Sequence, residues 1–323
     1  MALIERPAQG VVYRERTGPP LSNKTLVAAG AALLGIGLAG ALLRRRRAAL
    51  PPHRPDGFKR CARGLERGAA ILAASVVADS AMEHFRGNYD NRGMILAPLV
   101  ATATMATALA GRPAKTASSA VFGTAVAVGL TGLGFHFYNI TKRPGGLSWQ
   151  TLFYAAPFAA PGALALAGVL GLTAGRVPRA RYACSATQRY VATGLAWSVS
   201  ASLMVTASEV WVLHFRGAFH DPFMFVPVTI VPVAALALAH SGARPSPRNL
   251  TVTRWLLRLT ALVGLAGTGF HAFGISRNMG GWRNWSQNIF AGPPLPAPPS
   301  FTGLAFAGLG TLTLLSTCGG ADV

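Results

Sequence analysis

Four histidines stand at matched positions in two halves of the sequence, where they could ligate a metal. The tetrapeptide His-Phe-Arg-Gly occurs at 84–87 and again at 214–217, and a Gly-Phe-His tripeptide ends at 136 and at 271. Imidazole nitrogen binds heme iron and many transition metals. The candidate ligands are therefore His84, His136, His214 and His271.

The histidine motifs belong to a longer internal repeat, whose offset stays between 130 and 140 residues. Gly-Leu-Thr-Gly-Leu-Gly-Phe-His (129–136) matches Gly-Leu-Ala-Gly-Thr-Gly-Phe-His (264–271). A Gly-Gly segment ending in Trp follows each copy (142–149 and 277–285), and an Ala-Pro pair comes after it. Several matched motifs in one order indicate a duplicated structural unit.

Apolar blocks of membrane-spanning length carry these motifs. The chain is 51% hydrophobic and 12% charged, whereas soluble domains are about 25% charged. Blocks of about 20 apolar residues are long enough to cross the hydrocarbon core of a bilayer. The expected spans are residues 25–43, 66–85, 94–111, 117–138, 153–175, 190–214, 222–241, 253–273 and 299–317.

The sequence predicts an all-α integral membrane protein of about nine transmembrane helices. Residues 1–64 would form an N-terminal tail, a first transmembrane helix and a basic cytoplasmic linker. Two tandem four-helix bundles would follow, at 65–182 and 183–323. Because each repeat contains an even number of spans, a pseudo-two-fold axis along the membrane normal should relate the bundles.

Membrane topology explains the net charge of +20, since the basic residues lie between apolar blocks and indicate no nucleic-acid partner. Loops at one end of the spans carry about 18 Lys and Arg, against about 11 at the other end. The positive-inside rule then predicts a multi-pass protein of the bacterial inner membrane. Its N-terminus would be periplasmic, its C-terminus cytoplasmic, and its four histidines would lie at the outer face.

Heme b is the cofactor that this pattern favours. His84 would pair with His136 and His214 with His271, because the first and third helices of an up-down bundle lie diagonally across its core. Glycines beside His136 and His271 would leave room for a flat macrocycle. Arginine binds carboxylates bidentately, so the expected partners of the heme propionates are Arg86, Arg216 and Arg277.

Three carboxylates near the histidines leave other possibilities open. Asp79 and Glu209 occupy matched positions, whereas Glu83 has no counterpart in the second repeat. They could take protons at a quinone site, complete a metal site with the four histidines, or form hydrogen bonds inside the bundle. Ionisable groups at membrane depth are costly and commonly functional. Interfacial histidines, snorkelling arginines and packing glycines remain the alternative without a cofactor.

Motifs of soluble enzymes and of covalent heme attachment are absent. There is no Walker loop, nucleophile elbow, HExxH or C-x-x-C-H. The three cysteines show no paired spacing, so neither a disulfide framework nor a thiolate metal site is expected. An electron-transfer or non-catalytic subunit of an oxidoreductase complex is favoured over an enzyme.

The paired motifs, together with residues 274–288, resemble a bacterial multi-spanning membrane protein family over most of 65–317. The resemblance implies an association with periplasmic glucose-methanol-choline-type dehydrogenases and a small gluconate-dehydrogenase-like subunit. The implied function is electron transfer from such a dehydrogenase toward quinone. The alternatives are a cofactor-free anchor or assembly subunit, and a His/carboxylate metal-binding protein or transporter.

Overall fold

The fold is helical throughout the part of the chain that the structure describes. The computed structural model describes residues 56–111, 115–154, 159–177, 184 and 186–319. This part is 85% helical and contains no strand. The expected first span at 25–43 and the Arg44–Arg47 run lie outside the described residues.

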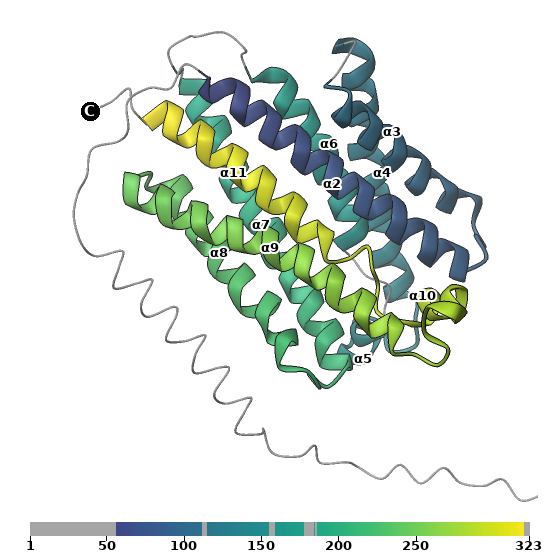
Figure 1. Ribbon diagram of the computed structural model, residues 1–323. Helices are drawn as coiled ribbons and strands as arrows, with labels where there is room; N and C mark the ends of the chain where they lie inside the picture. The colour runs from purple at the N-terminus through teal and green to yellow at the C-terminus, as the bar shows by residue number, and fades with distance from the viewer. Residues whose placement is uncertain (1–55, 112–114, 155–158, 178–183, 185, 320–323) are drawn as a thin grey trace, which may run out of the picture.

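Eight long helices account for most of the described chain (Figure 1). They overlap the eight expected spans that fall within the described residues. Short helices occupy several connections: η1 (Arg92–Ile95), α5 (Trp149–Phe153), η2 (Pro222–Met224), η3 (Gly281–Asn284) and α10 (Trp285–Ala291). The long helices are α2 (Gly57–Arg86), α3 (Leu96–Leu109), α4 (Lys115–Thr141), α6 (Ala159–Arg176), α7 (Ala186–Arg216), α8 (Phe225–Ala243), α9 (Pro247–Ser276) and α11 (Pro299–Gly319).

Six helical segments of the described chain are long and apolar enough to cross a membrane. Large apolar side chains also lie exposed on their outer surfaces, for example Leu99, Leu130 and Leu265. Extensive apolar exposure of this kind fits contact with lipid. The chain is therefore a multi-pass membrane protein. The six segments are Arg92–Leu109, Lys115–Thr141, Ala186–Arg216, Pro222–Ala243, Pro247–Ser276 and Pro299–Cys318.

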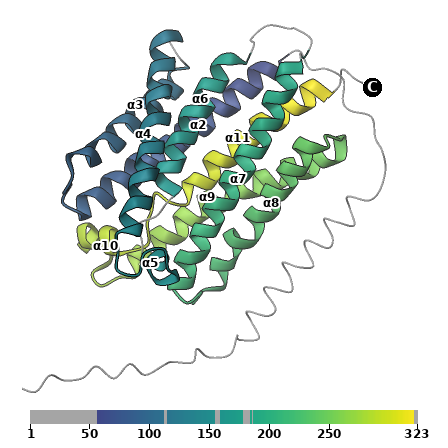
Figure 2. The same cartoon turned by 180° about the vertical axis from the view of Figure 1, so that it is seen from behind.

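The long helices pack in two groups of four. In the first helix group, α2 contacts α3 and α6, and α4 contacts the same two helices. In the second helix group, α7 and α9 each contact α8 and α11. The groups meet chiefly where α2 runs beside α11, as Figures 1 and 2 show from opposite sides.

Small residues allow α2 and α11 to approach closely. A Cβ atom added to Gly64 would lie 2.8 Å from the Cα of Gly310, and one added to Gly68 would lie 2.9 Å from the carbonyl oxygen of Gly303. Helices in membranes associate through such small-residue contacts, because lipid surroundings provide little hydrophobic drive. The glycine pattern therefore sets the principal contact between the two helix groups.

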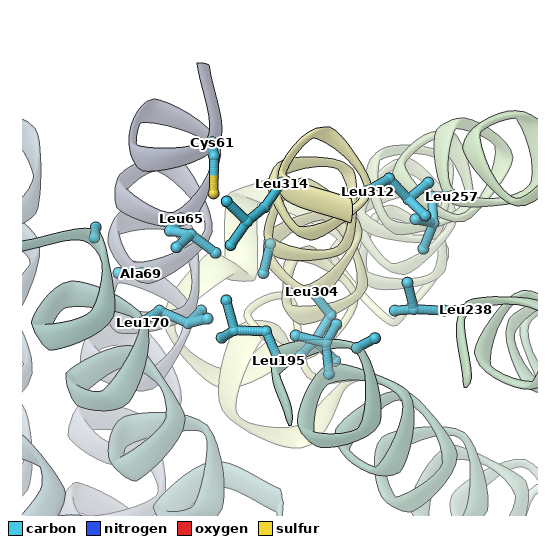
Figure 3. Close-up of a cluster of buried hydrophobic side chains, with 14 of the residues drawn as sticks. Cys61, Leu65, Ala69, Leu170, Leu195, Leu238, Leu257, Leu304, Leu312 and Leu314 are labelled. Carbon is cyan, nitrogen blue, oxygen red and sulfur yellow. The ribbon is translucent and has the colours of Figure 1, made fainter. Parts of the chain in front are cut away.

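The apolar core lies around α11. In the apolar stretch of α11, 78% of the residues are buried inside the protein, compared with 17% in the apolar stretches of α4 and α9. Figure 3 shows leucines of α2, α6, α7 and α11 meeting in this core, among them Leu65, Leu170, Leu195 and Leu304. The close packing of α11 with neighbours from both groups makes it the central helix of the described fold.

A disulfide joins the segment before α7 to the end of α11. Cys184 and Cys318 are bonded, with their Cα atoms 5.1 Å apart and a separation of 134 positions in the sequence. The expectation of no disulfide was therefore wrong. Spacing along the chain could not reveal the pair, because only the packing of α11 against its neighbours brings the two thiols together.

Candidate functional site

His84 and His214 make the same hydrogen bond in the two halves of the chain. The Nδ1 atom of His84 lies 2.7 Å from the carbonyl oxygen of Met94, and that of His214 lies 2.7 Å from the carbonyl oxygen of Met224. A carbonyl oxygen only accepts, so the imidazole nitrogen donates. In each neutral ring Nε2 is then the unprotonated nitrogen, which is the form that binds a metal.

The loops after these histidines also share an unusual backbone. Asn88 and Tyr89 have φ angles of 54° and 47°, and Ala218 and Phe219 have φ angles of 55° and 44°. Such left-handed conformations cost a non-glycine residue on the order of 1 kcal/mol or more. The matched loops, each tied down by its histidine, show that the sequence repeat is also a structural repeat at this point.

A capping residue missed by the sequence analysis completes each loop. The Asn91 side chain accepts a hydrogen bond from the Gly93 amide at 2.8 Å, and the Asp221 side chain accepts one from the Phe223 amide at 2.9 Å. Both turns start the next helix. Asp221 in the second repeat performs the same task as Asn91 in the first. The available signal was their shared offset of 130 residues.

His271 is anchored in a similar manner, at the end of α9. Its Nδ1 donates to the carbonyl oxygen of Pro294, at 2.7 Å. His136 is half-buried at the corresponding position on α4. The helix ends that carry the four histidines gather at one end of the molecule, beside α5 and α10 (Figures 1 and 2).

Two of the glycines expected to make room for a macrocycle serve helix packing instead. A Cβ atom on Gly129 would collide with the amide nitrogen of Ala165, and one on Gly264 would lie 2.8 Å from that of Thr302. The backbones of α6 and α11 fill this space. Gly134 and Gly269, nearer to the histidines, have no other atom within 4 Å of the added Cβ. Only these two leave open room.

A cavity of about 720 Å³ lies between α2, α6, α7 and α11. This volume falls in the range of small-molecule sites, roughly 300–1,000 Å³. Its walls come from matched positions of the repeat, 130 residues apart. They include Leu72, Asp79 and Arg86 on α2, with Ser202, Glu209 and Arg216 on α7.

The cavity collects acidic groups in a chain that has few of them. Three of the ten Asp and Glu residues line it: Asp79, Glu83 and Glu209. Three arginines line it as well: Arg86, Arg143 and Arg216. The formal charges of these six groups cancel, although the whole chain carries +20. Such a balance distinguishes the cavity from the basic ends of the molecule.

Acid and base keep the same spacing on both helices. Arg86 follows Asp79 by seven residues, and Arg216 follows Glu209 by seven. Seven residues make about two helical turns, or about 10.5 Å along the axis, and return to the same face. Each helix therefore presents a carboxylate deep in the cavity and an arginine near the histidine end.

The arginines already have partners within the protein. Arg86 Nη1 lies 2.7 Å from Glu83 Oε1. The Arg216 guanidinium lies over the rings of Phe153 and Tyr154, at 5.5 and 5.7 Å. These contacts hold both guanidinium groups in the wall of the cavity.

The remaining expected site residues lie outside the cavity lining. Arg277 stacks over Phe273, at 5.6 Å. None of the four candidate histidines lines the cavity either. The structure thus gathers the carboxylates with Arg86 and Arg216, and it separates this set from the histidines. Ser202 and Thr206 were not predicted, although the repeat register of Asp79 and Glu209 could have pointed to both.

Aromatic side chains surround the histidine end. Trp211 and Phe215 stack with their ring centroids 5.4 Å apart, and Trp149 of α5 lies 6.4 Å from Trp211. Trp149, Trp282 and Trp285 are all exposed. Exposed tryptophans at one level suit a membrane–water interface.

Among the described residues, no group of three or more His, Cys, Asp or Glu side chains could hold a metal ion. No family model, no curated protein and no solved structure matches this chain.

Proposed function

We propose that this protein is an integral membrane electron-transfer subunit that holds heme b through histidines at one end of the helices. The observation that carries the proposal is the Nδ1 hydrogen bond of His84, His214 and His271 to a backbone carbonyl. Metal-bound histidines almost always donate their second ring N–H in this way. The bond orients the ring and leaves Nε2 as the ligand atom.

The pairs would be His84 with His136 and His214 with His271, one for each repeat. The second pair is supported by the ends of α7 and α9, which carry His214 and His271 at the same end of the molecule. The open space beside Gly134 and Gly269 supports the proposal, because a macrocycle needs room near the histidine rings. Arg86, Arg216 and Arg277 are cations for the propionates at the same end. Bound heme would supply a one-electron carrier at this site.

The wider proposal is about nine spans in a bacterial inner membrane, arranged as two four-helix bundles about a pseudo-two-fold axis. Six apolar helices and the matched histidine loops support it. Electrons would pass from a periplasmic dehydrogenase subunit toward quinone. With this orientation, the histidine end lies at the periplasmic face, where such a partner could dock.

The absorption spectrum of the purified full-length protein tests the heme proposal. We expect a Soret band and, on reduction, the sharp α band of a bis-histidine b-type heme, with one heme for each repeat in a pyridine hemochrome assay. Protein from a heme-replete host that lacks a Soret band would contradict the proposal.

His214→Asn separates ligation from folding. The asparagine amide can still donate to the Met224 carbonyl, but it has no atom equivalent to Nε2. We expect loss of about half of the heme and little change in thermal stability. The control is His220→Asn, because exposed His220 lies in the same loop and bonds only the nearby Gly217 carbonyl, at 3.0 Å.

The second candidate function is a cofactor-free anchor or assembly subunit. The same Nδ1 bonds favour it, because securing two strained loops is by itself a structural reason for a histidine at each position. If this function holds, the double variant His84→Asn/His214→Asn keeps both the co-purification of partner subunits and the activity of the complex. Loss of activity with partners still bound would instead support electron transfer.

A further inference from the structure

We propose that the cavity between α2, α6, α7 and α11 binds a quinone-class ligand, with Asp79 and Glu209 accepting hydrogen bonds from the hydroxyl groups of its reduced form. This inference rests on the proposed redox function. It assigns the exchange of the mobile carrier to a site separate from the histidines.

The first argument is the placement of the carboxylates. Asp79 lies seven residues inside the C-terminal end of α2, and Glu209 lies at the same depth on α7. Ionisable groups within spanning helices are costly, so they are commonly retained for function. Both line one cavity, and one comes from each helix group.

The second argument is the number and kind of polar contacts. Two matched carboxylates can accept hydrogen bonds from two hydroxyl groups of a single ring, and a hydroquinone presents two such donors. The oxidised ring presents only acceptors, which ionised carboxylates cannot bind. A site of this composition should therefore distinguish reduced from oxidised ligand.

The third argument is the shape and charge of the remaining wall. Small residues from both groups, including Ala163, Ala201 and Ala297, line the cavity beside apolar Leu72 and Leu304. Such a surface suits a flat ring and an alkyl tail. The carboxylates Asp79, Glu83 and Glu209 balance the three arginines of the lining, which favours a neutral ligand over an anionic lipid headgroup.

Direct binding to the purified full chain tests the assignment. The probes are a decyl-substituted benzoquinol and its oxidised form, with the protein in phosphatidylcholine nanodiscs. We expect saturable binding of one molecule per chain, with the quinol bound more tightly. In Asp79→Asn/Glu209→Gln, we expect the preference for quinol over quinone to fall at least about tenfold, because amides also donate to quinone carbonyls.

A matched pair of bulky substitutions on α7 locates the binding site. Ser202 lines the cavity, whereas Ser208 is exposed on the same helix and bonds only to the carbonyl of its own helix at Met204. Ser202→Phe should weaken quinol binding at least about tenfold, and Ser208→Phe should leave it unchanged. Equal effects of the two substitutions would overturn the assignment.

Two further outcomes would also overturn it. One is a quinol preference that is unaffected in the folded carboxylate variant. The other is complete displacement of the probe when phosphatidylglycerol replaces phosphatidylcholine, because the site would then belong to an anionic lipid. The His84→Asn/His214→Asn variant separates the two proposals: it should lose the heme spectrum yet still bind quinol. A missing Soret band with normal quinol binding would reject the heme proposal alone.

Discussion

Each anchored histidine has two ring nitrogens with different roles. Nδ1 holds a loop carbonyl in place, and Nε2 is the atom that would ligate a metal in the proposed function. The same atoms therefore explain why a histidine suits a structural loop and why it suits a cofactor site. Only a substitution that keeps the N–H donor and removes the second nitrogen can separate these tasks, which is why asparagine is more informative than alanine.

Ala218→Asn should stabilise the protein by about 0.5–1 kcal/mol. Ala218 has a φ angle of 55°, and the first repeat has Asn88 at this position with a φ angle of 54°. Asparagine tolerates the left-handed region better than alanine. Thermal unfolding in detergent measures the effect, and Asn88→Ala should produce the opposite change. A lower melting temperature for Ala218→Asn would show that the loop is not strained there.

At the scale of the helices, close backbone contacts determine how neighbouring helices pack. Gly129 and Gly264 lie at matched positions and admit the backbones of α6 and α11, respectively. Thr302 of α11 reinforces the second contact by donating to the Ala261 carbonyl, at 2.9 Å. The glycine-rich motif therefore determines how the third helix of each group meets the fourth, and the walls of the cavity depend on that contact.

Gly264→Ala should destabilise the protein by about 1–3 kcal/mol, because the new methyl group meets backbone atoms that cannot rotate away. Gly269→Ala is the matched control on the same helix, where the added Cβ has open space. It should be neutral or slightly stabilising, since alanine favours helix more than glycine does. Equal melting temperatures for the two variants would contradict the packing role of Gly264.

At the scale of the whole molecule, two features give opposite indications of how the protein is oriented in the membrane. Basic residues cluster at the end where α2 begins and α11 stops, and the positive-inside rule would place that end in the cytoplasm. The Cys184–Cys318 disulfide lies at that same end, whereas disulfides persist mainly in oxidising compartments. Lys59, Arg60, Lys115, Arg176 and Arg248 are among the described basic residues at this end.

We expect the basic end to be cytoplasmic and the two cysteines to be thiols in the growing cell, with the bond forming on oxidation. Many charged residues together specify the membrane topology, whereas two neighbouring thiols are oxidised or reduced according to the redox state of their compartment. Cells quenched with acid and labelled with a maleimide polymer in denaturant should show the gel shift without reductant. A Cys61→Ser background removes the third thiol. A shift that needs reductant would place this end in the periplasm and reverse the proposed orientation.

Helix type, approximate helix positions and the duplication could be predicted from the sequence because they depend on local properties. Membrane-spanning length, apolar content and loop motifs are each visible within a few residues to a few helical turns. They can therefore be recognised without knowing which helices pack together. The eight described long helices and the matched loops at His84 and His214 are of this kind.

Only the tertiary structure decided which groups face one another. Asp79 and Glu209 share a cavity because α2, α6, α7 and α11 enclose it, and Cys184 meets Cys318 because α11 ends beside the segment before α7. Gly129 and Gly264 border other helices rather than the open room expected of them. These relations join residues up to 134 positions apart. They depend on helix packing, which spacing along the chain does not specify.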